Sequence, residues 1–342
     1  MKYWIDVTSP PHVHFFRALI KRLEKQGDEV LVTSRSFGIM NGILENNGIK
    51  YTSIGSHGGK NLEDKLIHSS ERVIGLARLI SKEKPDIALS KHSIESARVA
   101  FGMGIPSVSV IDHETASKQS RLTAPLANIV VSPEATEKAK LEAYGARAVK
   151  TFYGVCETAH FSDFKPSDGV LNELGLGRDE KIIITRSEPM LSSHNFHSSA
   201  LLAAVRDMKK EFPEAKVVFI PRSDGDRKLF AGEGLIMPEN PIDTLSLYSF
   251  ASLMVGAGSC MNREACISGC PTISLCPDRL PGVDKFLVEK GLMFHSTEKS
   301  EIMEKASEFL ESDAQRRKNN SIIGEFEDPH KTVLEAALSL VE

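Results

Sequence analysis

Short runs of apolar and β-branched residues alternate with longer amphipathic stretches along most of the chain. The short runs are bounded by Gly, Pro or Asp, which is typical of buried strands. In the first half of the chain they cover residues 3–7, 29–34, 51–54, 86–90, 106–111 and 128–132. The stretches between them, such as residues 14–27 and 62–85, carry apolar side chains at helical spacing and end at Gly or Pro. This alternation predicts βαβ units, in which a parallel sheet has helices on both faces.

The alternation pauses at residues 153–176, which are rich in Gly, Pro, Ser and Asp, and then begins again. The second series of predicted strands covers residues 181–186, 216–221, 252–257 and 271–276. A chain of 342 residues exceeds what one hydrophobic core usually supports. We therefore place a domain boundary near residues 154–172. The predicted organisation is an N-terminal domain of residues 1–155, a C-terminal domain of residues 156–328, and a helix in residues 329–342 that packs back on the first domain.

The composition is that of an ordinary soluble globular protein, with 41% hydrophobic and 26% charged residues. The formal net charge of -4 and the pI near 6.3 argue against a nucleic-acid-binding protein. The opening "MKYWIDVTSPPHVHFF" lacks the basic and apolar regions of a signal peptide. No apolar run approaches the roughly 20 residues needed to span a bilayer. We expect a cytoplasmic protein, while peripheral membrane contact and the oligomeric state stay open.

The five cysteines do not have the spacing of a metal site or a disulfide framework. The last four are separated by five, three and five residues, whereas structural zinc sites usually pair cysteines two to four residues apart. We interpret them as small residues that pack a helix against a sheet. A metal or redox protein is the alternative, and metal analysis would detect it. The cysteines are Cys156, Cys260, Cys266, Cys270 and Cys276.

Histidines and charged residues occupy the loops that follow four of the predicted strands in the first half. In open parallel sheets, ligands bind beyond the carboxyl ends of the strands. A single loop histidine is commonly a solvated turn residue, but several at one edge of a sheet indicate a site. These loops contain His12 and His14, His57 and Lys60, Lys91, His92, Ser93 and Glu95, and Asp112, His113 and Glu114.

Two loops of the second half combine arginine with hydroxyl groups. The loop after residues 181–186 has Arg186, Ser187 and Glu188 and continues to Ser192, Ser193 and His194. The loop after residues 216–221 has Arg222 and Ser223. Amides and hydroxyls at a helix N-terminus suit a phosphate group, although Ser also favours ordinary helix caps.

The predicted strand that ends at Gly256 runs into a glycine-rich turn with Gly258 and Ser259. Glycines allow close backbone approach and unusual dihedral angles. We expect a helix from about Asn262, with its positive end at the turn and Glu264 in its first turn. Glu264 can cap its own helix or accept hydrogen bonds from sugar hydroxyls. The turn lacks both the dinucleotide fingerprint and the P-loop pattern, so by itself it does not define the ligand.

Several segments resemble proteins with the GT-B fold, which include nucleotide-sugar glycosyltransferases and non-hydrolysing UDP-N-acetylglucosamine 2-epimerases. "PPHVHFFRALIKRLEKQGDEVLVTSR" (10–35) is similar to their opening unit, and "SRLTAPLANIVVSPEATEKAKLEAYGA" (120–146) resembles an epimerase segment. "GVCETAHFSDFKPSDGVLNELGL" (154–176) is similar to glycosyltransferase linkers. "GAGSCMNREACISGCPTISL" (256–275) resembles the pattern S-G-G-x-x-x-E-A…G-x-P of both classes. More narrowly, "IDVTSPPHVHFF" and the glycine-rich segment resemble an archaea-rich family of GT-B-like proteins, a domain of unknown function.

The resemblance implies two Rossmann-like, doubly wound parallel-sheet domains that face a cleft. It also implies that Glu264 holds the ribose of a nucleotide sugar and that nearby Gly and Ser amides hold its diphosphate. Epimerases carry a His where this chain has Arg186, and a carboxylate shortly before the position of Arg121, where this chain reads "ASKQSR". Glu114 matches their H-V-E glutamate. These departures favour glycosyl transfer over epimerisation.

We therefore predict a metal-independent glycosyltransferase that uses a nucleoside-diphosphate sugar as donor. The resemblance implies that the donor is linked to UDP. The acceptor is not identified. No bound cofactor is expected. The alternatives are a nucleotide-sugar 2-epimerase or hydrolase on the same fold, or a non-catalytic nucleotide-sugar-binding protein. The general base is predicted to be His12, and otherwise His92 or Glu114, with a histidine pKa near neutrality. The predicted contacts to the nucleotide sugar are Arg186, Ser187, Arg222, Gly256, Gly258, Ser259, Asn262, Arg263 and Glu264, of which the three arginines would stabilise the leaving group.

Overall fold

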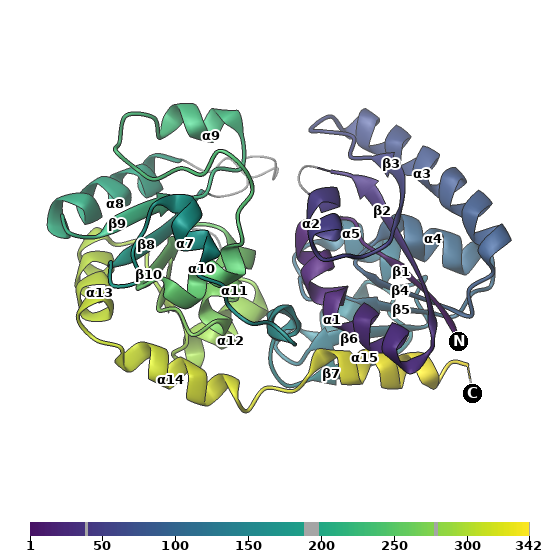
Figure 1. The fold of residues 1–342 in the computed structure, drawn as a ribbon. Helices are drawn as coiled ribbons and strands as arrows, with labels where there is room; N and C mark the ends of the chain where they lie inside the picture. Colours follow the sequence, from purple (N-terminus) through teal and green to yellow (C-terminus); the bar gives the residue numbers. More distant parts are fainter. Residues whose placement is uncertain (38–39, 188–197, 277–279, 342) are drawn as a thin grey trace. The chain divides into compact units, whose positions relative to one another are not determined.

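The computed structural model describes residues 1–37, 40–187, 198–276 and 280–341. The chain forms two compact α/β units, each built on its own parallel sheet (Figure 1). The first unit contains Met1–Ser162, Pro281–Val283 and Phe326–Glu342, and the second contains Asp163–Leu280 and Asp284–Glu325. The prediction of two Rossmann-like parallel-sheet domains is confirmed.

The sheet of the first unit has the strand order β3-β2-β1-β4-β5-β6-β7. Every neighbouring pair is parallel. The order reverses between β1 and β4, which are paired in register from Tyr3 with Ile87 to Asp6 with Ser90. Ligands of open α/β sheets bind at such a reversal. The strands are β1 (Lys2–Asp6), β2 (Glu29–Ser36), β3 (Thr52–Ser56), β4 (Ile87–Lys91), β5 (Ser107–Val110), β6 (Ile129–Pro133) and β7 (Val149–Phe152).

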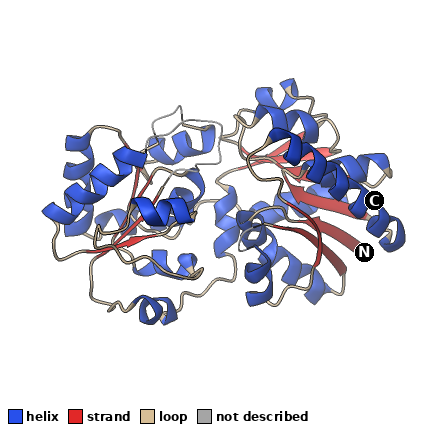
Figure 2. Ribbon diagram, turned by 90° about the horizontal axis from the view of Figure 1, so that it is seen from above, coloured by secondary structure: helices blue, strands red, loops and turns tan. Residues whose placement is uncertain are grey.

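Helices cover both faces of this sheet (Figure 2). Alternate residues of β1 point to opposite faces: Tyr3 and Ile5 join a core with Phe15 of α1 and Val333 of α15, whereas Trp4 joins a core with residues of α3 and α4. The helices of the unit are α1 (Pro10–Gln26), α2 (Met40–Asn46), α3 (Leu62–Glu83), α4 (Ile94–Gly102), α5 (Ser117–Thr123), α6 (Lys138–Ala143) and α15 (Pro329–Leu338), with a 3₁₀ helix at Cys156–Phe161.

The sheet of the second unit has the order β12-β11-β10-β8-β9, again with parallel neighbours. Its central strand β10 is fully buried and ends at Gly256, directly opposite Arg186 at the end of β8. The strands are β8 (Ile182–Arg186), β9 (Lys216–Phe219), β10 (Leu253–Gly256), β11 (Thr272–Ser274) and β12 (Phe294–His295). The helices are α7 (Gly169–Leu174), α8 (Ser198–Glu211), α9 (Asp224–Leu229), α10 (Thr244–Phe250), α11 (Ser259–Ile267), α12 (Gly282–Glu289), α13 (Lys299–Glu311) and α14 (Ala314–Ile323).

The ten predicted strands are confirmed to within about two residues at their ends. Two further strands, β7 and β12, lie at sheet edges and were not predicted. In β7 only Phe152 is buried, and β12 is two residues long, so neither has the continuous apolar run of a central strand.

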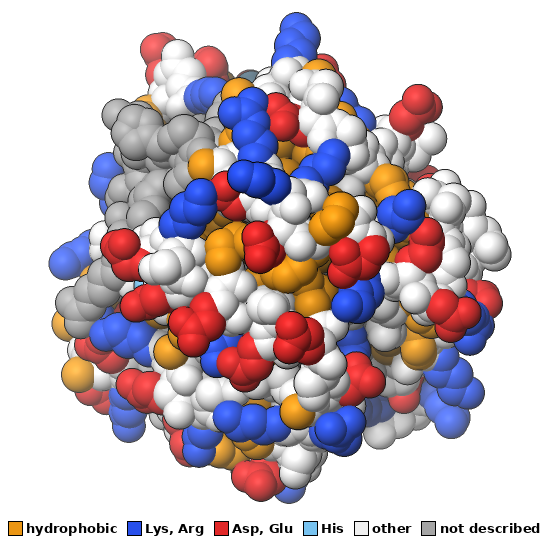
Figure 3. All heavy atoms as spheres, turned by 90° about the vertical axis from the view of Figure 1, so that its left-hand side faces the viewer, with side chains coloured by type: hydrophobic (Ala, Val, Ile, Leu, Met, Phe, Trp, Pro, Cys, Tyr) orange, Lys and Arg blue, Asp and Glu red, His pale blue; other side chains and the backbone are white. Residues whose placement is uncertain are grey.

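The surface carries charges of both signs. In Figure 3, Lys and Arg side chains are interspersed with Asp and Glu around small apolar areas, without a large field of one sign. Among the described helices, none is both long enough and apolar enough to cross a membrane.

Candidate functional site

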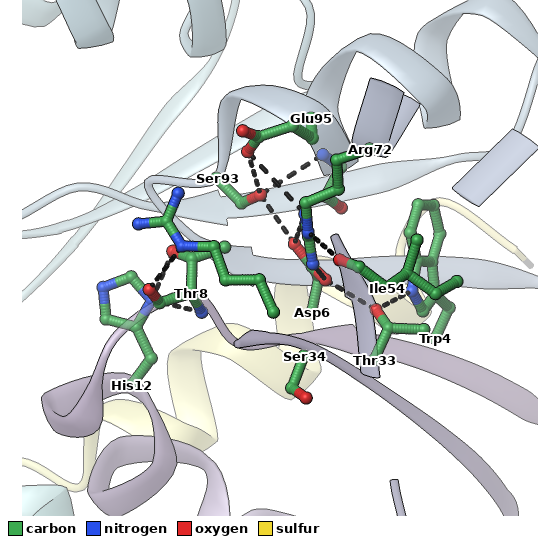
Figure 4. Close-up of polar contacts among 12 residues, drawn as sticks. Trp4, Asp6, Thr8, His12, Thr33, Ser34, Ile54, Arg72, Ser93 and Glu95 are labelled. Atoms are coloured by element: carbon green, nitrogen blue, oxygen red, sulfur yellow. Dashed lines mark hydrogen bonds and ion pairs between the residues drawn. The ribbon is translucent and has the colours of Figure 1, made fainter. Parts of the chain in front are cut away.

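A buried polar network lies at the carboxyl end of β1 in the first unit (Figure 4). Asp6 is completely buried and accepts hydrogen bonds from Arg72 Nη2 (2.6 Å), Thr33 Oγ1 (2.5 Å) and Ser93 Oγ (2.6 Å). Burial alone would raise the pKa of Asp6, but the Arg72 charge and these hydrogen bonds outweigh it and lower that pKa. Ser93 also caps α4 through the Ser96 amide. Asp6 therefore fixes the loop between β4 and α4 to the end of β1.

Arg72 extends the network to β3, the edge strand of the sheet. Its Nε donates to the Ile54 carbonyl oxygen of β3 at 3.0 Å, and its Nη1 lies 3.7 Å from Glu95 Oε2. A single guanidinium thus joins β3, the end of β1 and the start of α4. Sequence reasoning did not find Asp6 or Arg72.

His12 lies in the first turn of α1, beside this network. Its Nδ1 is 3.2 Å from Thr8 Oγ1, and the Thr8 carbonyl oxygen accepts a hydrogen bond from Arg35 Nε at 3.0 Å. Burial, together with the positive charge of Lys91, lowers the pKa of the His12 imidazole to about 3. The expectation of a near-neutral pKa is therefore wrong, because burial penalises the charged ring, and His12 is neutral at pH 7.

His92 follows β4 and is held in the left-handed region, with φ of 54°. Its Nε2 lies 3.0 Å from Ser120 Oγ, and its carbonyl oxygen accepts from Gln119 Nε2 at 2.5 Å. Burial lowers the pKa of His92 to about 4 despite the nearby Asp112 carboxylate. The expectation of a near-neutral pKa is wrong for this candidate as well. The ring is directed to α5, which favours a structural role over that of general base.

Lys91 and Asp112 form a buried ion pair at the ends of β4 and β5, with Nζ and Oδ2 2.8 Å apart. Burial alone would lower the pKa of Lys91, but the Asp112 carboxylate outweighs it and raises that pKa. Glu114 is also buried. Its Oε1 accepts from the Gly282 amide at 2.7 Å, and its Oε2 has no hydrogen-bond partner among the described residues.

The other predicted residues of this edge make local contacts. His57 Nδ1 accepts from the Gly59 amide at 3.0 Å, and burial lowers the pKa of His57. His113 Nδ1 lies 2.8 Å from Thr115 Oγ1. The His14 ring centroid lies 5.7 Å from that of His160, which is buried under α1.

The buried histidines make the stability of the first unit sensitive to mild acid. Burial lowers the pKa of His92 to about 4 and that of His160 to about 3, both below the unfolded value near 6.5. The unfolded chain then binds more protons than the folded one below about pH 6.5, so stability is lost as pH falls from there toward pH 4. We expect each histidine to cost about 1 kcal/mol per pH unit in this window.

Urea unfolding between about pH 7 and pH 5 measures this effect above the carboxylate titrations. His92→Gln should flatten the dependence relative to the wild type. An unfolding free energy that does not change across this interval would contradict the assignment.

The glycine-rich turn of the second unit lies at the carboxyl end of β10. The helix α11 begins at Ser259 with Gly258 as its N-cap, not at Asn262 as predicted, so Glu264 lies in the second turn and cannot cap the helix. A Cβ on Gly258 would lie 2.5 Å from Arg222 Nη2, and one on Gly256 would contact Asn262 Oδ1. A larger residue at either position would therefore require the side chain of Arg222 or Asn262 to move.

Asp226 accepts hydrogen bonds from two of the residues that were predicted to contact the nucleotide sugar. It is fully buried, and its Oδ2 accepts from Ser187 Oγ at 3.0 Å and from the Arg222 amide at 2.8 Å. Arg222 Nε donates to the Ser187 carbonyl oxygen at 2.8 Å. Sequence reasoning missed Asp226, although "DGD" at 224–226 has the Asp-x-Asp spacing and follows a predicted strand.

Four buried polar atoms around the turn have no hydrogen-bond partner among the described residues. They are Thr185 Oγ1 and Arg186 Nε at the end of β8, Asp226 Oδ1 in α9 and Asn262 Oδ1 in α11. Arg186 Nη1 contacts Met261 Sδ, and Asn262 Nδ2 donates to the Gly256 carbonyl oxygen at 2.9 Å. Native structures leave few buried polar atoms unsatisfied, and those that remain commonly belong to functional sites.

Arg263 forms a buried ion pair beside the turn. It is buried, and its Nε and Nη2 donate to the two carboxylate oxygens of Asp284 at 2.9 and 2.8 Å. The Ser259 hydroxyl donates to the same carboxylate at 2.6 Å. This bidentate pair ties α11 to α12.

Glu264 is buried one turn further along α11. Its Oε2 accepts from the Tyr248 hydroxyl at 3.3 Å, and burial, followed by the Glu264 charge, raises the pKa of Tyr248 well above its usual value. Of the predicted set, the structure brings Arg222, Ser187, Gly258 and Gly256 together, with Arg186 and Asn262 beside them. Glu188, Ser192, Ser193 and His194 lie outside the described residues.

The cysteines of this segment differ in exposure, because Cys260 of α11 is exposed and Cys276 is half-buried. Cys266 and Cys270 are buried, and burial raises the pKa of Cys270 to about 12, so this thiol is not reactive at neutral pH. In the part of the chain that the structure describes, no three His, Cys, Asp or Glu side chains are grouped so that they could hold a metal ion.

Two parallel-sheet α/β units, a topological reversal in each sheet and a glycine-rich turn before a helix define a GT-B-type protein. The chain belongs to the family described as "Protein of unknown function (DUF354)", whose model matches residues 1–342. An uncharacterised protein of Methanocaldococcus jannaschii is 39% identical over 337 residues, which are 97% of this chain and 96% of that protein.

Other similarities are to sugar-nucleotide proteins. A UDP-N-acetylglucosamine–N-acetylmuramyl-(pentapeptide) pyrophosphoryl-undecaprenol N-acetylglucosamine transferase of Clostridium perfringens is 32% identical over 141 residues, 39% of this chain and 38% of that protein. The UDP-GlcNAc 2-epimerase of Neisseria meningitidis bound to UDP-GlcNAc has a TM-score of 0.74 and 16% identity, and the match covers 99% of this chain and 100% of that one. The spinosyn rhamnosyltransferase SpnG with spinosyn aglycone has a TM-score of 0.65 and 13% identity, covering 98% and 99% of the chains.

Proposed function

We propose that this protein is a glycosyltransferase that uses a nucleoside-diphosphate sugar, UDP-linked, and needs no bound metal. The observation that supports a diphosphate ligand is the arrangement around the turn of the second unit. A guanidinium, that of Arg222, lies against Gly258 at the start of α11, and the buried donor Arg186 Nε lacks a partner among the described residues. Helix N-termini and arginine are the groups that proteins commonly place on phosphate oxygens.

In the proposed reaction, the acceptor hydroxyl oxygen attacks the anomeric carbon of the donor sugar. The bond from that carbon to the diphosphate oxygen breaks, and its electron pair leaves with the nucleoside diphosphate. Arg222 and the first amides of α11 stabilise the charge that develops on the leaving oxygen. The second unit thus holds the donor by its diphosphate.

His12 is the proposed base. The Thr8 amide donates to its Nδ1 at 3.4 Å, and Thr8 Oγ1 lies 3.2 Å from the same nitrogen, so Thr8 orients the ring. Proton acceptance at Nε2 requires the tautomer in which Nδ1 carries the proton and the Thr8 hydroxyl oxygen accepts it. Arg35 fixes the backbone of Thr8 and thereby the ring that contacts it. A single displacement of this kind inverts the anomeric centre.

Glu264 is proposed to bind the ribose of the donor. A carboxylate that accepts from hydroxyls contributes about 1.5–3 kcal/mol, so Glu264→Gln should weaken UDP binding by roughly 10- to 150-fold. Isothermal titration measures this change. The control is Glu298→Gln at the N-cap of α13, where the side chain makes no cap hydrogen bond and UDP affinity should not change. Equal affinity of Glu264→Gln and the wild type would remove the ribose assignment.

Epimerisation or hydrolysis of the nucleotide sugar is the second candidate function. The similarity over the whole length of a UDP-GlcNAc 2-epimerase and the buried Glu114 with an unpartnered Oε2 favour it. Arg186 argues against epimerisation, because the epimerases that this chain resembles carry a catalytic histidine at that position. NMR of UDP-GlcNAc incubated with the protein separates these reactions. Inversion at C2 would indicate epimerisation, and release of UDP with free sugar would indicate hydrolysis. Transfer forms a new anomeric linkage on an added acceptor.

A further inference from the structure

Arg35 places a positive charge at the carboxyl end of the sheet of the first unit. It is the penultimate residue of β2, next to the reversal between β1 and β4 at which open α/β sheets bind ligands. The residue is half-buried, and its Nε donates to the Thr8 carbonyl oxygen at 3.0 Å. Among the described residues, no carboxylate forms an ion pair with its guanidinium. The edge of the guanidinium that carries Nη1 and Nη2 is therefore available to a ligand.

The carboxylates that attract the Arg35 charge are held by another arginine. They are Glu95 and Asp6. Asp6 Oδ1 lies 2.6 Å from Arg72 Nη2, and Glu95 Oε2 lies 3.7 Å from Arg72 Nη1 (Figure 4). Burial has the largest effect on Arg35 and lowers the pKa of its guanidinium. A partly desolvated guanidinium without its own carboxylate is a suitable group to bind an anion.

A second hydrogen-bond donor lies against the same aromatic ring as Arg35. The Arg35 guanidinium carbon is 5.5 Å from the centre of the Phe37 ring, and the centre of the His57 ring is 4.5 Å from it. His57 Nδ1 accepts from the Gly59 amide at 3.0 Å, so the proton of the neutral ring is on Nε2. Burial, followed by the positive charges of Arg35 and Lys65, lowers the pKa of His57 and favours this neutral form. The Nε2–H group is thus a donor to which no described residue offers an acceptor.

Helix α1 begins at the same edge of the sheet but has few backbone donors to offer. Its first two residues, Pro10 and Pro11, have no N–H group. The His12 amide donates to the Ser9 carbonyl oxygen at 3.0 Å. An anion at this edge is therefore bound by side chains and not by the first amides of α1.

We infer that Arg35 and His57 form a phosphate-binding subsite, and that the acceptor is a hydroxyl compound that carries a phosphate group. The two Nη groups and the imidazole N–H supply donors from two side chains, which suits the three oxygens of a phosphate. A carboxylate has two oxygens, which one guanidinium satisfies by itself. The assignment of the phosphate to the acceptor rests on the proposed glycosyl transfer, whereas the subsite itself does not.

Thr8 joins this subsite to the proposed base. Its carbonyl oxygen accepts from Arg35 Nε, and its hydroxyl oxygen lies 3.2 Å from His12 Nδ1. Figure 4 shows Thr8 and His12 side by side at the edge of the buried network. One residue thus orients both groups, so a single acceptor molecule has its phosphate on Arg35 and its hydroxyl group at His12.

Isothermal titration of the full chain with glycerol phosphate tests the subsite, with UDP at a saturating concentration to occupy the turn of the second unit. Glycerol phosphate should bind, and glycerol should not. Arg35→Met should weaken this binding at least about 10-fold, because it removes charge-assisted hydrogen bonds. Arg35→Lys should lose less, because it keeps the charge without the fork. The control is Arg147→Met, at an exposed arginine just before β7 and the amino ends of the strands, and it should bind as the wild type does.

NMR of protein labelled with ¹⁵N-histidine locates the bound phosphate. The resonances of His12 and His57 should shift when glycerol phosphate is added, whereas that of His295, in β12 of the second unit, should not. His57→Ala removes one neutral hydrogen bond and should weaken binding by about 2- to 10-fold. An unchanged affinity of Arg35→Met for UDP shows that this variant is folded.

Three results would overturn the inference while UDP binding, and with it the proposed function, is retained. The wild type could fail to bind glycerol phosphate in the presence of UDP, or Arg35→Met could bind it as tightly as the wild type. Acetate could bind as tightly as glycerol phosphate, which would make this a carboxylate site. The opposite result, binding of glycerol phosphate that depends on Arg35 in a protein that does not bind UDP, would support the subsite and contradict the proposed glycosyl transfer.

Discussion

His12→Ala is expected to lower the turnover of the nucleotide sugar by about 10²- to 10⁴-fold, the usual contribution of a positioned general base. The affinity for UDP should not change, because the nucleotide binds to the second unit in the proposed mechanism. Release of UDP in the presence of acceptor measures turnover, and isothermal titration measures affinity. His68→Ala, on α3 and away from Thr8, is the control and should retain full activity.

The low pKa of His12 adds a second expectation to this variant. The base must be unprotonated, and burial lowers the pKa of His12 to about 3, so activity is present above that pKa and lost only as pH falls toward it. The fall in kcat/KM on the acid side should occur well below pH 6. It is measured at pH values at which the protein remains folded. A limb at about pH 6–7 that disappears in His12→Ala would contradict this protonation state. Unchanged turnover in His12→Ala would remove the residue from the mechanism.

Asp6→Ala is expected to lower the free energy of unfolding by about 3–5 kcal/mol. The substitution leaves the buried Arg72 guanidinium with the more distant Glu95 carboxylate, 3.7 Å from Nη1, and it removes the acceptor of the Ser93 and Thr33 hydroxyls. Urea unfolding followed by circular dichroism measures the loss. Asp168→Ala, which breaks an exposed ion pair with Arg178, should have a much smaller effect.

A double variant distinguishes a buried unpaired charge from simple loss of packing. Asp6→Ala combined with Arg72→Met removes both charges, and it should regain part of the stability that Asp6→Ala loses. If Asp6→Ala costs less than about 1 kcal/mol, the network does not hold the strand ends together.

The alternation of apolar strands and amphipathic helices was sufficient to predict the fold, because buried parallel strands are continuous apolar runs. The differences between the predicted and the observed elements have local causes. The strand β7 presents mainly half-buried and exposed residues at a sheet edge. The start of α11 was placed three residues late because Ser259, Cys260 and Met261 carry no strong helix-start signal beyond the preceding glycine.

The candidate site was predictable as a set of loops but not as a set of contacts. Strand-end loops can be read from the sequence, because parallel strands bring their carboxyl ends to one edge. The approach of Arg222 to Gly258 and the pairing of Asp6 with Arg72 join residues far apart in the chain, and no local pattern specifies them. A charged residue within an apolar strand or helix face is the one signal that could have marked Asp6 and Arg72.

The histidine pKa values were missed for a related reason. A ring in a polar loop reads as solvated in the sequence, whereas packing against neighbouring elements decides how much water it meets. The same holds for Arg263. Its place near the turn suggested a phosphate contact, but Asp284, 21 residues later, accepts its hydrogen bonds.

Titration of UDP into the purified protein tests directly whether the turn between β10 and α11 binds a nucleoside diphosphate. We expect saturable binding that stabilises the protein by roughly 2.7 kcal/mol at one hundred times the dissociation constant. Arg222→Ala should weaken that binding by about 10-fold or more, because it removes a charge-assisted phosphate contact. Binding of no nucleotide or nucleotide sugar by the wild type, or equal binding by Arg222→Ala, would contradict this expectation.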